Sequence, residues 1–383
     1  MTGLLRFFLA AIVVASHLIN THFYLHLGYY AVRAFFILSS FAMTAALHEH
    51  YRFDGARFWS NRFLKLAPTY FVVCALTSLA IGLFPQQAAY FMPRWAHQAS
   101  LSDLIGNIAI VPIVFLGADR LIFIEPAWSL AVEIVMYAAL FLFVARNAAF
   151  AFYGFALGFC FHLVATLSDA PFEQIYFSIE GAILSFSIGA LAYFWSRQNS
   201  REIRPAAAFF VLTAWLVNLF AEGALAPIDY PRQAGFYVNI LLSTLLCIAL
   251  TSLKAPPKLR RIDGFLGDLS YPVFLVQWLG GFVGFMLLSG AALRGWTLLA
   301  AAVTPILLIA AALASLQRRY VEPLRGRIRR DDMDGFIIRA SEGSPFPSET
   351  AIAALQLAEA GEPQIARRVN PSQTTSAGQA FVI

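Results

Sequence analysis

The chain has 383 residues, of which 59% are hydrophobic and 13% are charged. Soluble proteins carry about 25% charged residues, so this composition excludes a soluble globular protein and indicates an integral membrane protein. With a net charge of only +5, we expect membrane lipids but no nucleic acid among its partners. The three cysteines, at positions 74, 160 and 247, lie in apolar runs, which favours buried thiols over disulfides and predicts no metal site.

The first predicted helix contains two ionisable residues in the otherwise apolar stretch LLRFFLAAIVVASHL. The separation between Arg6 and His17 corresponds to roughly three helical turns, so both side chains lie on one face, about 16 Å apart. Ionisable groups within a span mark a polar path or a site, although two interfacial anchors would give the same pattern. The VAS before His17 resembles a signal-peptide cleavage site, but we expect the segment to be retained.

Further apolar runs predict an all-α fold with about ten transmembrane helices. A span needs about 20 mainly apolar residues. The candidates are 4–20, 30–48, 66–84, 127–145, 149–167, 176–195, 206–221, 235–253, 266–289 and 296–316.

Basic residues predict the orientation of these spans. With a cytoplasmic N-terminus, all but five of the 27 Lys and Arg residues fall on the inside, as cytoplasmic loops require. Both termini are therefore expected in the cytoplasm. The five exceptions are Arg33, Arg94, Arg120, Arg232 and Arg294.

The loop before the third span carries a pair of cations. Arg62 and Lys65 are three residues apart, so they share a helical face. Two cations at a membrane entrance can hold a phosphate-bearing ligand, although ordinary positive-inside anchoring is the alternative.

Residues 104–117 are apolar but short for a span and contain Pro112. We interpret them as a re-entrant or interfacial element in a long outer loop, about 85–126. Aromatic residues of this region either stack on sugar rings or form an interfacial belt. They are Tyr90, Phe91, Trp95 and Trp128.

The fourth predicted span, with the sequence WSLAVEIVMY, places Glu133 at a depth similar to that of His17. An imidazole near working pH is suited to take a proton from a hydroxyl, and a buried carboxylate can pair with it. Each residue taken alone also fits a structural role.

Beyond the last span, residues 326–383 lack a hydrophobic face large enough to form a core. This composition predicts a mostly disordered cytoplasmic tail.

With these residues in view, the chain resembles the acyltransferase 3 family of integral membrane enzymes over about 1–325, its predicted membrane domain. Five motifs carry the resemblance in the expected order. They are Arg6-x10-His17, FFILSSF at Phe35–Phe41, RFLK at Arg62–Lys65, WSLAVE with Trp128, Ser129 and Glu133, and LGDLSYPVFLVQ with Tyr271.

Some residues depart from the family pattern. Lys65 replaces an arginine and so lacks the bidentate fork, while Ala31 and Ser40 replace glycines. Gln277 replaces a histidine, so that histidine's role does not carry over. None of the departures affects Arg6, His17 or Glu133.

The resemblance implies a bacterial inner-membrane O-acyltransferase that acts on cell-surface carbohydrates. The donor would be acyl-CoA, most commonly acetyl-CoA, with its phosphates near Arg62 and Lys65 and with no tightly bound cofactor. His17 would act as general base or transient acyl carrier, assisted by Arg6 and Glu133. Trp128, Ser129 and Tyr271 would contact the acceptor glycan, such as an exopolysaccharide or an O-antigen. The alternatives are a transporter or flippase of a lipid-linked saccharide, and an inactive scaffold.

Overall fold

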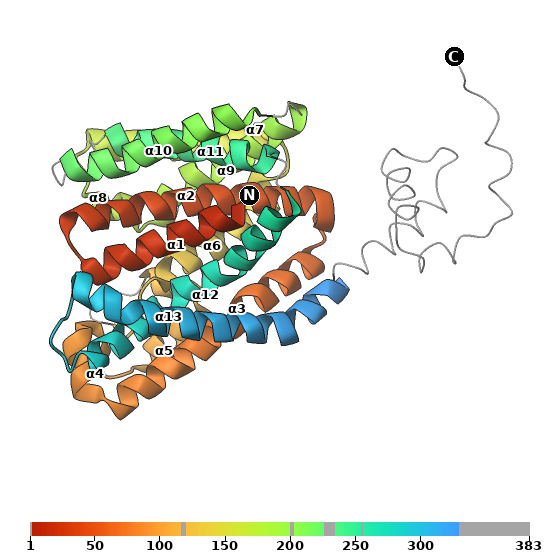
Figure 1. The fold of residues 1–383 in the computed structure, drawn as a ribbon. Helices are drawn as coiled ribbons and strands as arrows, with labels where there is room; N and C mark the ends of the chain where they lie inside the picture. Colours follow the sequence, from red (N-terminus) through yellow and green to blue (C-terminus); the bar gives the residue numbers. More distant parts are fainter. Residues whose placement is uncertain (1, 116–119, 200–202, 226–233, 254–255, 329–383) are drawn as a thin grey trace, which may run out of the picture. The chain divides into compact units, whose positions relative to one another are not determined.

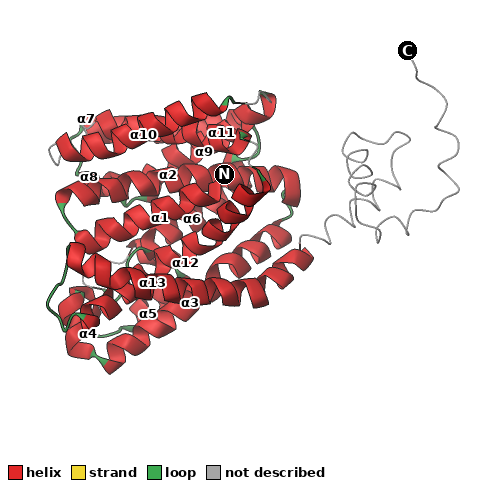
Figure 2. Cartoon of the chain, viewed as in Figure 1, coloured by secondary structure: helices red, strands yellow, loops and turns green. Residues whose placement is uncertain are grey.

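The computed structural model describes residues 2–115, 120–199, 203–225, 234–253 and 256–328, and it divides the chain into two units, Met1–Arg325 and Gly326–Ile383. The tail predicted to be disordered lies, apart from its first residues, outside the described residues. Every regular element within the described ranges is helical (Figure 2).

Long helices make up the first unit (Figure 1). They are α1 (Thr2–Ile19), α2 (His22–Ala46), α3 (Gly55–Leu83), α6 (Ala127–Ala139), α7 (Ala148–Leu167), α9 (Ile179–Gln198), α10 (Pro205–Leu225), α11 (Ala234–Ser252), α12 (Pro257–Leu287) and α13 (Trp296–Leu316).

The prediction of an all-α protein with many membrane-spanning helices is confirmed, whereas the orientation of the helices stays a prediction. Among the described residues, nine helical stretches are long and apolar enough to cross a membrane, and α10 adds a shorter apolar stretch, Pro205–Phe220. Three of the nine continue beyond an α-helix into a π-helical turn. These turns are η1 (Leu47–Tyr51), η4 (Leu140–Val144) and η6 (Gln317–Val321).

Three helices begin well before the apolar pattern predicts: α2 at His22, α3 at Gly55 and α12 at Pro257. α3 starts at Gly55 because the Asp54 side chain accepts a hydrogen bond from the backbone N–H of Arg57 at 3.0 Å, which caps the first turn. α12 starts at Pro257, since proline is well tolerated in the first turn of a helix. Arg62 and Lys65 therefore lie within a continuous helix instead of a loop.

The outer segment between α3 and α6 consists of short elements. α4 (Pro85–Phe91) and η2 (Pro93–Ala96) are followed by α5 (Leu101–Ala109), which ends where Ile110 adopts φ +65°, and by η3 (Val111–Phe115). None of these elements is long enough to span a membrane, as predicted for this segment as far as residue 115, where the described residues pause. Its re-entrant or interfacial placement stays a prediction.

Polar side chains hold this outer segment in place. The Asn107 amide donates to the carbonyls of Asp103 and Leu121, both at 2.8 Å, and the Tyr70 hydroxyl donates to the Asn107 carbonyl at 2.9 Å. The segment is thereby attached to α3.

α1 packs against both α2 and α12 (Figure 1). At its start, a Cβ added to Gly3 would lie 2.0 Å from the carbonyl oxygen of Asp263, so glycine is needed where α1 crosses α12.

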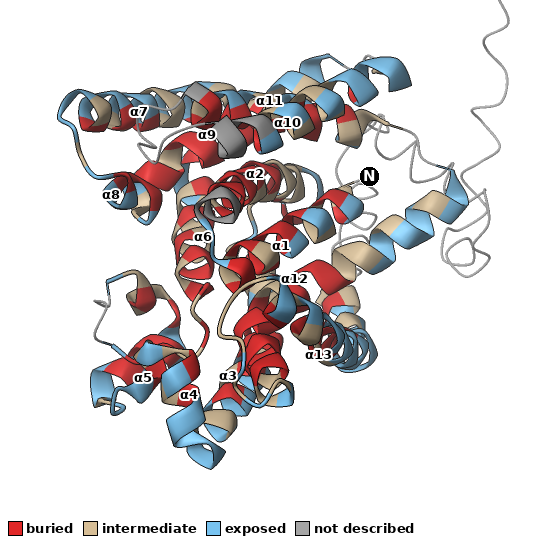
Figure 3. Ribbon diagram, turned by 60° about the vertical axis from the view of Figure 1, so that its left-hand side comes forward, coloured by how far each residue is buried: buried red, intermediate tan, exposed pale blue. Residues whose placement is uncertain are grey.

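Buried residues gather where α1, α2, α6 and α12 face one another, whereas the far sides of α7 and α13 are exposed (Figure 3). Their exposed side chains, such as Phe152 and Leu308, are apolar, as expected of surfaces that face lipid.

Candidate active site

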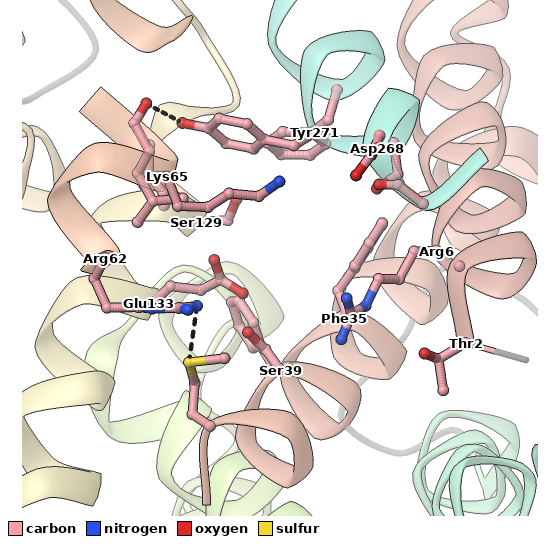
Figure 4. Close-up of a pocket in the computed structure, with 18 of the residues that line it drawn as sticks. Thr2, Arg6, Phe35, Ser39, Arg62, Lys65, Ser129, Glu133, Asp268 and Tyr271 are labelled. Atoms are coloured by element: carbon pink, nitrogen blue, oxygen red, sulfur yellow. Dashed lines mark hydrogen bonds between the residues drawn. The ribbon is translucent and has the colours of Figure 1, made fainter. Parts of the chain in front are cut away.

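A cavity of about 370 Å³, here called the inner cavity, is enclosed by residues of α1, α2, α3, α6 and α12 (Figure 4). Six of the eight predicted site residues line it, although they come from four different helices. They are Arg6, Arg62, Lys65, Ser129, Glu133 and Tyr271. The structure thus brings together most of the predicted site.

Three cations supply positive charge to the inner cavity. Figure 4 shows the side chains of Arg6 and Lys65 directed into the space that they share. Arg62 lies one turn before Lys65 and donates to the sulfur of Met43 at 3.1 Å. Within the part of the chain that the structure describes, no carboxylate lies within ion-pairing distance of any of the three cations. Their charge is available to an anionic ligand.

The acidic residues around the same cavity are occupied by protein groups. Hydroxyls of Ser39 and Tyr137 face Glu133, and they lie 2.7 Å from each other. Asp268 pairs with Arg318 at 3.0 Å, and Asp263 accepts a hydrogen bond from the Leu4 backbone N–H at 2.9 Å. Each of these carboxyl groups thus has a protein partner other than Arg6, Arg62 or Lys65.

Backbone contacts position the wall residues of α3. The Tyr271 hydroxyl donates to the Leu66 carbonyl at 2.9 Å, so α12 is tied to α3 beside the cavity. Gln317 donates to the Lys65 carbonyl at 3.0 Å and accepts from the Thr69 hydroxyl at 3.2 Å. Lys65 is therefore held by α12 and by the extension of α13.

A second cavity of about 180 Å³, the outer cavity, contains His17 and Trp128 in its wall. The imidazole Nδ1 of His17 lies 2.8 Å from the side-chain oxygen of Gln277. Trp128 makes edge-on contacts with Tyr176 and Phe177, with ring centroids 5.1 Å and 4.7 Å away. This cavity therefore offers one polar ring nitrogen in largely aromatic surroundings.

Three side chains separate the two cavities. Val32, Ser129 and Phe274 line both of them, and we call these residues the partition. Arg6 and His17 accordingly lie on opposite sides of the partition, although they share one face of α1. His17 and Glu133, which the sequence placed at similar depths, are not brought together, because Glu133 faces the inner cavity.

Several residues of this site were not selected from the sequence. Gln277 departs from the family pattern in the sequence, yet it is the hydrogen-bond partner of His17. Val32 and Phe274 carry no chemical signal in the sequence, because apolar residues in apolar helices are unremarkable. Ser39 lies within the FFILSSF motif, which was the one available signal for it.

The aromatic residues of the outer loop are placed differently from one another. Phe91 and Trp95 are 1% and 3% exposed and belong to the hydrophobic core, so they are not available to stack on a sugar. Tyr90 is exposed.

In the same region, Arg94 forms an ion pair with Glu125 at 3.3 Å. Burial raises the pKa of the Glu125 carboxyl, and the positive charge of Arg94 opposes that shift.

The described residues contain no group of three or more His, Cys, Asp or Glu side chains placed to hold a metal ion. The site instead consists of cations, one imidazole, hydroxyls and a carboxylate around two adjacent cavities. These groups define a multi-pass membrane protein that is equipped for an anionic ligand and for proton transfer.

A comparison with protein families gives this class a name. The model of the acyltransferase 3 family, described as an acyltransferase domain, matches residues 3–316. The chain belongs to this family and is a multi-pass membrane acyltransferase. No curated protein and no solved structure matches the chain.

Proposed function

We propose that the protein is an O-acyltransferase of the bacterial inner membrane. It moves an acyl group, acetyl in the first instance, from acyl-CoA at the cytoplasmic side to a hydroxyl of a cell-surface or exported glycan. An exopolysaccharide and an O-antigen are acceptors of this kind. Trp128 and Ser129, which line the outer cavity, are the proposed acceptor contacts, whereas Tyr271, which we expected to join them, lines the inner cavity.

One observation carries this proposal: three cations, for which the described residues offer no ion-pair partner, line a cavity that shares three wall residues with a cavity containing His17. Coenzyme A carries phosphates at one end and the reactive thioester at the other. Arg62 and Lys65 would hold the phosphates, and Arg6 would orient the arm that leads toward the partition. The separation of about 16 Å between Arg6 and His17 along α1 suits such an extended arm.

The proposed reaction balances without any further reactant. The acceptor hydroxyl oxygen attacks the thioester carbonyl carbon, so that a C–O bond forms and the C–S bond breaks. The hydroxyl proton goes to His17, which returns it to the departing coenzyme A thiolate. If His17 instead carries the acyl group transiently, a C–N bond to the imidazole forms as the C–S bond breaks, and the C–O bond to the acceptor then forms as that C–N bond breaks. The acceptor's proton again ends on the coenzyme A thiolate.

The test is a comparison of glycan masses from three strains. One strain lacks the protein, one carries it, and one carries His17→Ala at the same membrane abundance. The intact protein is expected to add an acyl mass that the other two strains lack. Purified protein supplied with acetyl-CoA and the glycan should release coenzyme A in equal amount.

Two outcomes would contradict the proposal. Identical masses in all three glycans, together with no coenzyme A release, would exclude acyl transfer to that acceptor and favour transport. An acyl mass that persists with His17→Ala would retain the acyltransferase but remove His17 from the chemistry.

A further inference from the structure

Gln277 of α12 is fully buried and lies directly against the His17 imidazole. Its side-chain oxygen is 2.8 Å from Nδ1 of His17, while its side-chain nitrogen donates to the Phe274 carbonyl at 2.7 Å. The second contact fixes the orientation of the amide, because a carbonyl oxygen accepts a hydrogen bond only from the NH2 end.

The orientation of the amide determines which tautomer His17 adopts. The oxygen of Gln277 can only accept, so Nδ1 of His17 must carry the proton and donate it. The lone pair then resides on Nε2. Among the described residues, Gln277 is the one hydrogen-bond partner of this ring. Nε2 is accordingly the nitrogen left for chemistry in the outer cavity.

We propose that Gln277 is a positioning residue that holds His17 in the Nδ1-protonated tautomer, with Nε2 as the basic atom. This inference rests on the proposed acyl transfer and adds to it the atom that receives the proton. It also explains how the chain functions with a glutamine where the family resemblance led us to expect a histidine. A neutral histidine there would offer the same acceptor to His17 and the same donor to Phe274.

Other groups around His17 do not set the tautomer. Tyr29 and Tyr176 line the outer cavity with it. Arg294 acts on the imidazole electrostatically from the loop before α13, and lies 4.9 Å above the ring of Trp278. Arginine has no acceptor, so it cannot receive the Nδ1 proton.

The first test compares Gln277→Met, which keeps the shape but removes the acceptor, with Gln277→His, which keeps an acceptor. Gln277→Met is expected to lower kcat about 10- to 100-fold with little change in KM for the donor. The acid limb of its pH–rate profile should move to lower pH, since the protonated ring loses a stabilising partner. Gln277→His is expected to retain most of kcat.

The matched control is Asn239→Leu, which removes another fully buried amide, one that donates to the Tyr30 carbonyl at 3.2 Å away from both cavities. Asn239→Leu should not move the acid limb, whatever its effect on protein abundance. A Gln277→Met protein with wild-type kcat, or one whose kcat falls with no movement of the acid limb, would overturn the inference. Wild-type protein without any transfer would overturn the proposed function as well, so the two failures are distinguishable.

A second measurement does not depend on the Gln277 variants being stable. Histidine labelled with 15N in the wild-type protein reports the tautomer of each ring, and the His17 signals are assigned by their loss in His17→Gln. We expect a protonated Nδ1 and an unprotonated Nε2 at neutral pH. The opposite tautomer would overturn the inference.

Discussion

Arg6 and His17 share a helix face but not a cavity. In the reaction that we propose, donor binding and acceptor chemistry would therefore involve different side chains. This separation gives substitutions at the two positions different kinetic signatures. The catalytic imidazole should affect turnover, whereas the cations of the inner cavity should affect donor affinity.

His17→Gln is expected to lower kcat by about 10²- to 10⁴-fold, because the proton acceptor is lost. KM for acyl-CoA should stay within a few-fold of wild type, because the phosphates bind on the other side of the partition. Steady-state kinetics in detergent or in vesicles measures both constants. A KM that rises as much as kcat falls would place His17 in donor binding instead.

Lys65→Met is expected to raise KM for acyl-CoA about tenfold, since a cation without an ion-pair partner is removed from the inner cavity. Lys65→Arg should match or improve on wild-type KM, because it restores the planar fork. Lys258→Met, at an exposed position near the start of α12, is the control. Equal effects at both lysines would indicate a general surface attraction without a defined phosphate site.

At the scale of single residues, the sequence predicted the ionisable groups of the site because such groups are rare inside apolar helices. Six of the eight predicted residues meet in one cavity. The pairing of His17 with Gln277 was not predictable, because it joins residues 260 positions apart and depends on how α1 faces α12.

At the scale of helices, the thickness of the partition is set by how closely α2, α6 and α12 approach one another. Val32 comes from α2, Ser129 from α6 and Phe274 from α12. An acyl group that passes from donor to acceptor must fit between these side chains, so the partition should limit its size.

Val32→Ala is expected to broaden the range of acyl donors. The ratio of kcat/KM for butyryl-CoA to that for acetyl-CoA should rise about tenfold. Room for one or two more methylene groups of the substrate changes an enzyme's selectivity by about this factor. Val73→Ala, in a buried position that lines neither cavity, should leave the ratio unchanged. An unchanged ratio in Val32→Ala would mean that the partition does not select the acyl group.

Gly3→Ala tests the crossing of α1 and α12. The added Cβ would lie 2.0 Å from the Asp263 carbonyl oxygen, so the helices must separate. We expect a loss of stability of roughly 1–3 kcal/mol, visible as a lower Tm in detergent. Gly82→Ala, where nothing lies within 4 Å, is the control. An unchanged Tm for Gly3→Ala would show that the crossing tolerates a side chain.

Apolar length predicted which segments are helical but not where all of them begin. The starts of α3 and α12 depend on a cap at Asp54 and on Pro257, and these polar turns precede the apolar run. The short elements between α3 and α6 could not be predicted from the sequence either, because they depend on hydrogen bonds from the Asn107 amide to the carbonyls of Asp103 and Leu121.

For the molecule as a whole, the distribution of Lys and Arg predicts that the inner cavity opens toward the cytoplasm. Reporter fusions test this directly. Alkaline phosphatase fused after His97 or Gly290 should be active, and green fluorescent protein fused after Arg325 should fluoresce. The reverse pattern would place the cationic cavity on the side without coenzyme A and contradict the proposed donor.

The partition also has an electrical consequence. Where water enters both cavities, the voltage across the membrane falls mainly over the few ångströms that Val32, Ser129 and Phe274 occupy. A unit charge that moves through the full voltage changes its energy by about 2.3 kcal/mol per 100 mV. Moving the acceptor's proton inward to the coenzyme A thiolate would therefore be sensitive to the voltage of the living cell. The same three side chains must remain sealed against ions while they let an acyl group pass.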